Sequence, residues 1–292
     1  MNLDINTKFG NISKSKEKYI NFSIDNLTIV ANFKRNDLFY LFVRKYVTNS
    51  ENNDTISKDS KNDFFEFSFM IKEKIFCQID RISNKVRLEF NPNKIDNDII
   101  EEINFILSNL INVHFTRLDL AIDLYNYKLE DYTIIDIGNR KKAYFYSRTN
   151  SLETFYSGSN KSSKYIRIYN KAKEQKIDNL DWWRFELQLR DVYIEKYQNG
   201  LDTFYKDIFV FKYSCIDNLP IETIAMIEYL LHDITRLDKL SKNAKTKYKK
   251  YIRELELRSI DFFDDVLSLT EERVNNYLQY ICERLSLPRV LL

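Results

Sequence analysis

The sequence predicts an α+β fold with a mainly antiparallel central sheet, one polar sheet face, helices on the other face, and a C-terminal helical region. Between residues 22 and 190, short segments alternate apolar and polar side chains, which is the period of a half-buried strand. From Pro220 onward, the apolar residues recur at helical spacing instead.

The first elements follow directly from this pattern. The polar first 22 residues predict a flexible N-terminus. Phe22–Asn32 predicts a strand, and Asn36 is placed to cap a short helix. Phe64–Arg81 and Lys85–Asn91 predict two further strands joined by a short turn.

A helix is expected to begin at Asp98, with Glu101 completing a capping box. The strands expected after it are Phe115–Leu124, Lys142–Ser147, Leu152–Tyr156, Tyr165–Lys171 and Trp183–Arg190, of which the second and third form a hairpin.

Three helices are predicted near the C-terminus. The first is entered by Pro220, the second spans Lys242–Leu257 and is strongly basic at its start, and the third spans Glu271–Leu285. The change of period near residue 215 predicts an α+β domain over residues 23–215 and a helical region over residues 216–292.

Composition excludes several classes of protein. There are only 4 glycines, and neither a GxGxxG nor a Walker-type phosphate loop is present. A membrane span and a signal peptide are not expected, because no apolar run is long enough. The 3 widely spaced cysteines predict reduced thiols in a cytoplasmic protein, and only 2 histidines leave little for a zinc site.

The positive charge is segregated, although the net charge is only +2. Residues 140–176 hold ten Lys/Arg against two Glu, and residues 236–258 hold nine Lys/Arg against three Asp/Glu. Any one lysine run is usually solvated surface, but two separate basic segments favour a polyanion as partner.

Four of the predicted strands bring charged side chains to one face. They carry the pairs Arg87 with Glu89, Arg117 with Asp119, Arg167 with Tyr169, and Arg184 with Glu186. A plain solvated sheet face, with each carboxylate in a surface ion pair, is the alternative reading of this pattern. Against it, each strand brings arginine together with a carboxylate or a tyrosine.

Such a face suits phosphodiester transfer. Carboxylates from neighbouring strands can bind a hard divalent cation, arginine and lysine can neutralise phosphate, and a tyrosine can attack phosphorus. The expected metal ligands are Glu89, Asp119 and Glu186. Asp123 lies four residues after Asp119, about 13 Å along a strand, so a salt bridge suits it better.

The choice of nucleophile lies between two tyrosines of one predicted strand. Tyr165 and Tyr169 share a face of Tyr165–Lys171. The residues themselves favour Tyr169 only slightly, since Arg167 and Lys171 flank it on its own face.

Taken together in chain order, five segments and a basic C-terminal stretch resemble the Rep_trans family, the replication initiators of small staphylococcal-type rolling-circle plasmids. The segments are Ser23–Asn32, Val86–Lys94, Phe115–Asp123, Phe155–Glu174 with its RIYNK motif, and Trp183–Leu189, followed by Lys245–Glu256.

The resemblance implies a metal-dependent, sequence-specific nickase and ligase that joins the 5′ end of one DNA strand to the tyrosine of RIYNK, here Tyr169, with Arg167 and Lys171 beside it. It also implies Mg²⁺ or Mn²⁺, a homodimer, a host DNA helicase, and an origin recognised as duplex and as single-stranded hairpin. Origin specificity in the C-terminal part would suit the basic helix, through Lys242, Lys245, Lys247, Lys249, Lys250 and Arg253.

Two alternatives accompany this reading. Related proteins are relaxases for conjugative transfer with the same chemistry, and a chain of this fold can also be a non-catalytic origin-binding protein. A covalent adduct with DNA separates the second alternative from the other two.

Overall fold

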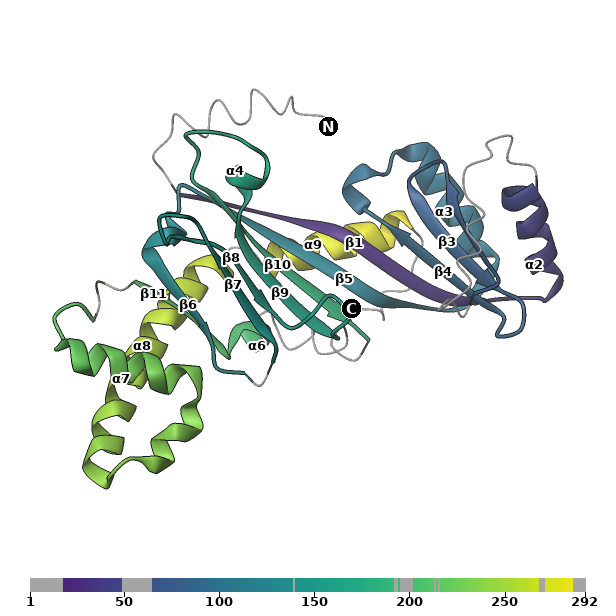
Figure 1. Ribbon diagram of the computed structural model, residues 1–292. Helices are drawn as coiled ribbons and strands as arrows, with labels where there is room; N and C mark the ends of the chain where they lie inside the picture. Colours follow the sequence, from purple (N-terminus) through teal and green to yellow (C-terminus); the bar gives the residue numbers. More distant parts are fainter. Residues whose placement is uncertain are drawn as a thin grey trace. The chain divides into compact units, whose positions relative to one another are not determined.

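The computed structural model describes residues 18–48, 65–138, 140–191, 194, 202–212, 214, 216–267 and 271–285 (Figure 1). Nine strands follow one another in the hydrogen-bonded order β2-β3-β4-β1-β5-β10-β9-β8-β7, and β11 pairs with β6. Each strand pair with a resolved register is antiparallel. The predicted α+β class with a mainly antiparallel sheet is therefore confirmed, whereas most of the predicted flexible N-terminus lies outside the described residues.

The described elements alternate strands with short helices before a helical C-terminal part. The strands are β1 (Tyr19–Phe33), β2 (Phe67–Ile71), β3 (Ile75–Asp80), β4 (Lys85–Phe90), β5 (Leu110–Tyr125), β6 (Tyr132–Asp136), β7 (Lys142–Tyr146), β8 (Leu152–Ser157), β9 (Lys164–Asn170), β10 (Trp182–Arg190) and β11 (Ile208–Lys212). The α-helices are α2 (Asp37–Phe42), α3 (Asn97–Ser108), α4 (Lys171–Glu174), α6 (Asp202–Tyr205), α7 (Ile221–His232), α8 (Lys242–Leu267) and α9 (Glu271–Arg284). None of the helices in the described part of the chain is long and apolar enough to cross a membrane.

The chain forms two compact units, each built from separated segments. Unit 1 comprises residues 1–22, 122–187 and 199–273, and unit 2 comprises residues 23–121, 188–198 and 274–292. The described elements that follow β11 are all helical, as the change of period predicts. The division into a nicking domain over residues 23–215 and a DNA-binding region over residues 216–292 stays a prediction.

Unit 2 contains a strand missed in the sequence pattern. The predicted strand Phe64–Arg81 is wrong, because the chain turns back at Lys72 and Glu73 and forms the hairpin of β2 and β3. Both residues have positive φ, 49° and 57°, in a three-residue loop that is closed by the pair Ile71 and Ile75. Asparagine or glycine usually marks such a turn, and neither is present here.

The N-cap of helix α3 in unit 2 lies two residues before Asp98, the capping residue that the sequence predicts. The N-cap is Asp96, whose Oδ1 accepts a hydrogen bond from the backbone N–H of Ile99 at 3.0 Å. The apolar face that predicts the helix is buried as expected, through Ile99, Ile103 and Ile106 among others. Burial of this stripe supplies most of the stability of a 12-residue helix.

Unit 1 contains the sheet edge that carries the candidate site. Strands β7, β8 and β9 form two successive hairpins, and Phe155, Ile166 and Ile168 are fully buried on one of their faces. The residues between them point to the opposite face. That face is the polar one that the alternation predicts.

A second core in unit 1 joins helices to a small sheet that the sequence did not reveal. Strands β6 and β11 pair antiparallel and pack with α7 and α8 through Phe209, Phe211, Ile227, Leu230 and Leu255. Ser259 of α8 also bonds the backbone of β11, accepting from the N–H of Val210 at 3.0 Å. This packing fixes which side of α8 faces solvent.

Candidate active site

Tyr169 of β9 lies beside two charged side chains of unit 1. Its hydroxyl donates a hydrogen bond to Oε1 of Glu186 on β10 at 2.5 Å. The other oxygen of Glu186 forms an ion pair with Nη1 of Arg167 at 3.0 Å. Tyr169 is 4% exposed, whereas the side chains of Arg167 and Glu186 are 33% and 22% exposed. The phenol therefore lies under charged groups that solvent and ligands can reach.

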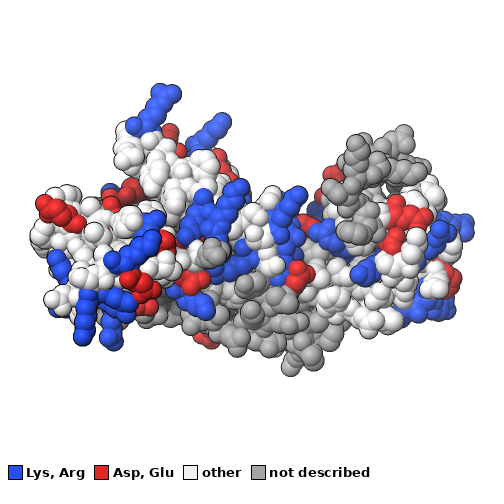
Figure 2. Space-filling model, turned by 60° about the horizontal axis from the view of Figure 1, so that its bottom comes forward, with Lys and Arg blue, Asp and Glu red and all other residues white. Residues whose placement is uncertain are grey.

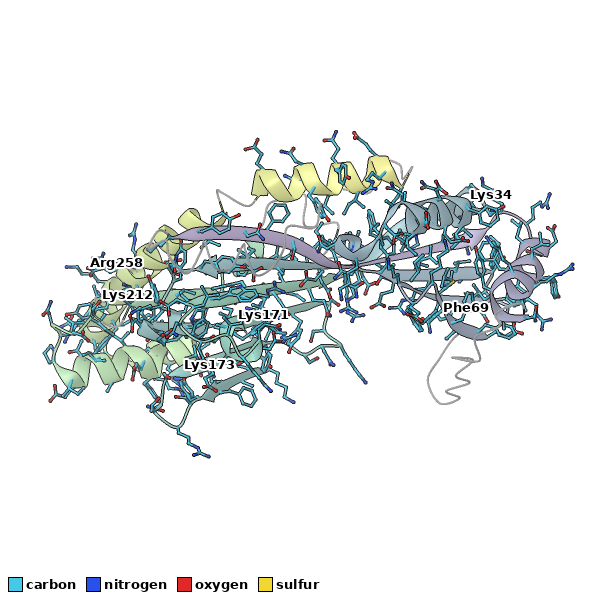
Figure 3. All side chains as sticks on the ribbon, turned by 90° about the horizontal axis from the view of Figure 1, so that it is seen from above. Lys34, Phe69, Lys171, Lys173, Lys212 and Arg258 are labelled. Atoms are coloured by element: carbon cyan, nitrogen blue, oxygen red, sulfur yellow. The ribbon has the colours of Figure 1, made fainter. Side chains whose placement is uncertain are left out.

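Two cations flank the Tyr169 ring. The guanidinium carbon of Arg167 lies 4.8 Å from the ring centroid and the ammonium of Lys171 lies 5.5 Å from it. Figure 3 labels Lys171 and Lys173, which come from α4, directly after β9. The predicted strand ends one residue early, because Asn170 caps α4 by accepting from the N–H of Lys173, so Lys171 reaches the ring from a helix.

The surroundings keep Tyr169 protonated. Burial raises the pKa of its phenol well above the ordinary value, and the hydrogen bond and charge of Glu186 raise it further. The hydroxyl is thus a donor whose proton already points at a carboxylate. Arg167 has one further donor to offer, since its Nε is buried without a hydrogen-bond partner among the described residues.

The rival tyrosine has different surroundings. Tyr165 is half-buried, and its ring stacks on Tyr156 at a centroid distance of 6.0 Å with 17° between the planes. Burial also raises its pKa, but here the nearby Arg167 lowers it in part. Within the described residues, the Glu186 carboxylate accepts the hydroxyl of Tyr169.

In unit 2, the predicted ligands Glu89 and Asp119 converge on one guanidinium. Arg117 donates to both oxygens of Asp119, from Nε at 2.8 Å and from Nη2 at 2.5 Å, and its Nη1 reaches Glu89 at 3.1 Å. Glu89 also accepts from Arg87 and from Asn26. Burial raises the pKa of Asp119 above its ordinary value, although Arg117 opposes the shift.

Hard divalent ions prefer carboxylate oxygens as ligands. Glu89 and Asp119 offer such oxygens from two different strands, and both now contact the guanidinium of Arg117. The same arginines compete with an ion for these oxygens. Within the described residues, no group of three or more His, Cys, Asp or Glu side chains is arranged to hold a metal. Glu186 as third ligand joins residues of both units and stays a prediction.

The expected salt bridge of Asp123 is present. Asp123 is 3% exposed, and its two oxygens accept from Nε and Nη2 of Arg184, each at 2.7 Å. The indole N–H of Trp182 donates to the same carboxylate at 2.7 Å. Asp123 thus holds β5 to β10 beside the strand segment that carries Glu186, and it supports the site without taking part in it.

Replacing Asp123 with alanine should destabilise the protein by about 3–5 kcal/mol, because the substitution leaves a buried guanidinium without its carboxylate. The matched control is Glu153→Ala, which removes a pair with Lys173 whose side chains are 37% and 54% exposed. That control should cost less than about 1 kcal/mol. Urea unfolding monitored by circular dichroism measures both, and equal losses would contradict the structural role of Asp123.

The predicted DNA-binding residues lie on the outer side of α8. Ile252, Leu255 and Ser259 are buried, which turns the intervening positions outward. The side chains left exposed are Lys242, Lys247, Lys249, Lys250 and Arg253, while Lys245 is half-buried and pairs with Asp238 at 2.5 Å. On the left of Figure 2, where Figure 1 draws α7 and α8, lysine and arginine side chains project into solvent.

Two roles were missed in the sequence. Arg117 bridges Glu89 and Asp119, and Glu186 binds the phenol of Tyr169. A signal for the first exists, because arginine and carboxylate two residues apart on a strand share a face, as in Arg87-x-Glu89 and Arg117-x-Asp119. No such signal exists for the second, since the spacing from 169 to 186 carries no strand register.

Comparisons with known proteins show which family the chain resembles. The model of the family described as "Replication initiation factor" matches residues 113–218, which include β9 and β10. A replication initiation protein of Staphylococcus aureus is 30% identical over 88% of this chain and 83% of its own length. A second from the same species is 30% identical over 72% of this chain and 70% of its own length.

Among solved structures, a rolling circle replication initiator protein from Geobacillus stearothermophilus aligns with 73% of this chain and 84% of its own, at a TM-score of 0.36 and 15% identity. The sequence matches decide the family, because one relative at 30% identity is covered over most of both chains. The chain belongs to the family of replication initiation proteins.

Proposed function

We propose that this protein starts rolling-circle replication of a plasmid by nicking one strand at the origin, and that it later rejoins the strand. The nucleophile is Tyr169, and the product is a 5′-phosphotyrosine. The observation that supports this most directly is the hydrogen bond from the Tyr169 hydroxyl to Glu186, with Arg167 on the other carboxylate oxygen.

The chemical step transfers one phosphoryl group. Oη of Tyr169 attacks the scissile phosphorus, the bond from phosphorus to the 3′ oxygen breaks, and the 3′ oxygen takes a proton from water and leaves as the hydroxyl that primes a polymerase. Glu186 takes the phenolic proton, which the raised pKa of Tyr169 would otherwise hold at neutral pH. The energy of the phosphodiester bond is kept in the phosphotyrosine ester, so the reverse reaction rejoins the strand without ATP.

Arg167 and Lys171 place positive charge next to the negatively charged oxygens of the scissile phosphate. Both cations lie within 6 Å of the Tyr169 ring centroid, at 4.8 Å and 5.5 Å. The Arg167 side chain is 33% exposed, so part of its guanidinium is open to a phosphoryl oxygen. These contacts stabilise the transition state more than the ground state if the negative charge beside them increases during transfer.

We also propose that Glu89 and Asp119 hold Mg²⁺ or Mn²⁺. A divalent ion bound there would act as a Lewis acid on a phosphoryl oxygen. The donor atoms support this assignment, because carboxylate oxygens of two different strands lie within reach of one side chain, Arg117, which an ion would have to displace. Adding EDTA should abolish nicking, and full activity in EDTA would overturn it.

The proposal is tested by a covalent label. The wild-type protein is incubated with a single-stranded oligonucleotide from its plasmid origin, labelled at its 3′ end, and with Mg²⁺, and is then denatured in SDS. We expect a labelled band at the mass of the protein plus DNA. Tight origin binding with no SDS-resistant label would instead identify a non-catalytic origin-binding protein.

The exposed side of α8 is proposed to hold the origin duplex, partly through phosphates. Replacing Lys247, Lys249 and Lys250 together with alanine should weaken binding and lower the slope of log K against log salt by about 3, close to one counterion per lysine. Lys85→Ala with Lys94→Ala, also exposed but in unit 2, is the control and should leave the slope nearly unchanged. Fluorescence anisotropy with origin duplex measures it, and an unchanged slope for the α8 variant would remove α8 from the interface.

A homodimer and a host DNA helicase are the proposed protein partners. Light scattering on the purified chain tests the dimer, and a monomer at working concentration would exclude it.

Stimulation of helicase unwinding on nicked origin plasmid tests the second partner, the host DNA helicase.

A further inference from the structure

A row of aromatic rings lies on the same sheet face as Tyr169. In the register of β7, β8 and β9, Phe145 is opposite Thr154, and Thr154 is opposite Tyr169. Tyr156 is opposite Arg167 in the same way. Residues opposite each other in a sheet point to the same face, so these side chains share the face of the nucleophile.

The rings contact one another in sequence. Phe145 meets Tyr156 edge to face at a centroid distance of 5.6 Å, and Tyr156 stacks on Tyr165 at 6.0 Å. The Arg167 guanidinium carbon lies 5.8 Å from the Tyr156 ring and 4.8 Å from the Tyr169 ring. The row therefore runs from the edge strand β7 to the Tyr169 site, with a cation at the junction.

The structure separates these rings from the other aromatic residues of the same hairpin. Phe155 is fully buried on the face opposite to Tyr169, and its register partner Tyr144 packs against it there. Phe145 is 54% exposed, and Tyr156 and Tyr165 are half-buried. Only rings that keep part of their surface open can accept a ligand, which leaves Phe145, Tyr156 and Tyr165 on this face.

We infer that Phe145, Tyr156 and Tyr165 form a stacking platform for unpaired bases of the DNA strand next to the nick. Aromatic rings beside cations are the usual means of holding single-stranded nucleic acid, because every base has a π face while the cations hold the phosphates. The excess of ten Lys/Arg over two Glu in residues 140–176 suits a polyanion. Since stacking alone does not tell DNA from RNA, the choice of DNA rests on the proposed function.

The test measures binding apart from cleavage. Anisotropy of fluorescein-labelled oligo(dT) in EDTA reports affinity for Phe145→Thr and Tyr165→Thr. Each variant should bind about 5- to 20-fold more weakly, while affinity for origin duplex stays the same. Tyr165→Phe, which keeps the ring, should bind like the wild type.

Tyr146→Thr is the matched control. Tyr146 neighbours Phe145 on β7, is also 54% exposed, and stacks on Tyr144 of the opposite face. Wild-type affinity in both Phe145→Thr and Tyr165→Thr, or an equal loss in Tyr146→Thr, would overturn the platform. Ring-dependent binding without any SDS-resistant adduct would leave the platform standing and refute the proposed nicking reaction, whereas an adduct with ring-independent binding does the reverse.

Discussion

Tyr169→Phe is expected to abolish the SDS-resistant adduct and the nicking of supercoiled origin plasmid, a loss on the order of 10⁴-fold or more. The ring and its packing between Arg167 and Lys171 are kept, and only the oxygen that forms the phosphoester is removed. The free energy of unfolding should fall by about 1.5–3 kcal/mol, since one hydrogen bond to the charged Glu186 carboxylate is lost, so the variant stays folded. Affinity for origin duplex should be unchanged, which separates loss of chemistry from loss of binding.

Two further variants make this result decisive. Tyr146→Phe removes an exposed hydroxyl on β7, on the opposite face, and should nick like the wild type. Tyr165→Phe tests the rival on the same strand. An adduct that survives Tyr169→Phe but disappears in Tyr165→Phe would show that Tyr165 is the nucleophile. The hydrogen bond from Tyr169 to Glu186 would then have no role in catalysis.

The alternation of apolar and polar residues predicted most of the strands, because burial of one sheet face is a local pattern with a fixed period. The polar face with Arg167 and Tyr169 follows from it, whereas the register of β8 and β9 is known only from the structure. The turn at Lys72 and Glu73 did not follow, because positive φ there is imposed by the pairing of β2 and β3 and not by turn residues. Strands β6 and β11 were missed because they pair with each other across a long stretch of chain.

The sequence predicted which types of residue form the candidate site but not which side chains bond to one another. Period-2 alternation shows that Glu186 shares a face with other polar groups, but which oxygen meets which donor depends on strand order. The order β10-β9 places Glu186 on Tyr169. Likewise, Asp123 and Arg184 pair because β5 neighbours β10, a relation that distance along the chain does not reveal.

Glu186→Gln gives the second large effect, and it tests the direction of proton transfer. Glutamine keeps the volume and can still accept the hydrogen bond of the phenol, but it takes up no proton. Adduct formation near neutral pH should fall by about 10²- to 10⁴-fold. A role of Glu186 in ion pairing alone would predict a loss with no change in the pH profile.

The pH dependence of the rate distinguishes a Glu186 that accepts the proton from a Glu186 that only forms an ion pair. Burial and the Glu186 bond both raise the pKa of Tyr169, so the phenol is protonated at neutral pH and needs an acceptor. Without the carboxylate, the phenol must lose its proton to solvent, so the rate of the variant should rise about tenfold per pH unit below the pKa of the phenol. The wild-type rate should rise less steeply over the same range.

Rapid-quench measurement of adduct formation between pH 7 and pH 9 decides between the two profiles, with Glu153→Gln as the charge-matched control. Glu153 forms an exposed pair with Lys173, and removing its charge should leave both the rate and the profile unchanged. Parallel profiles for Glu186→Gln and the wild type would show that another group accepts the proton. In that case the 2.5 Å contact positions the ring of Tyr169 for attack, and the base must be sought among the groups that approach when DNA binds.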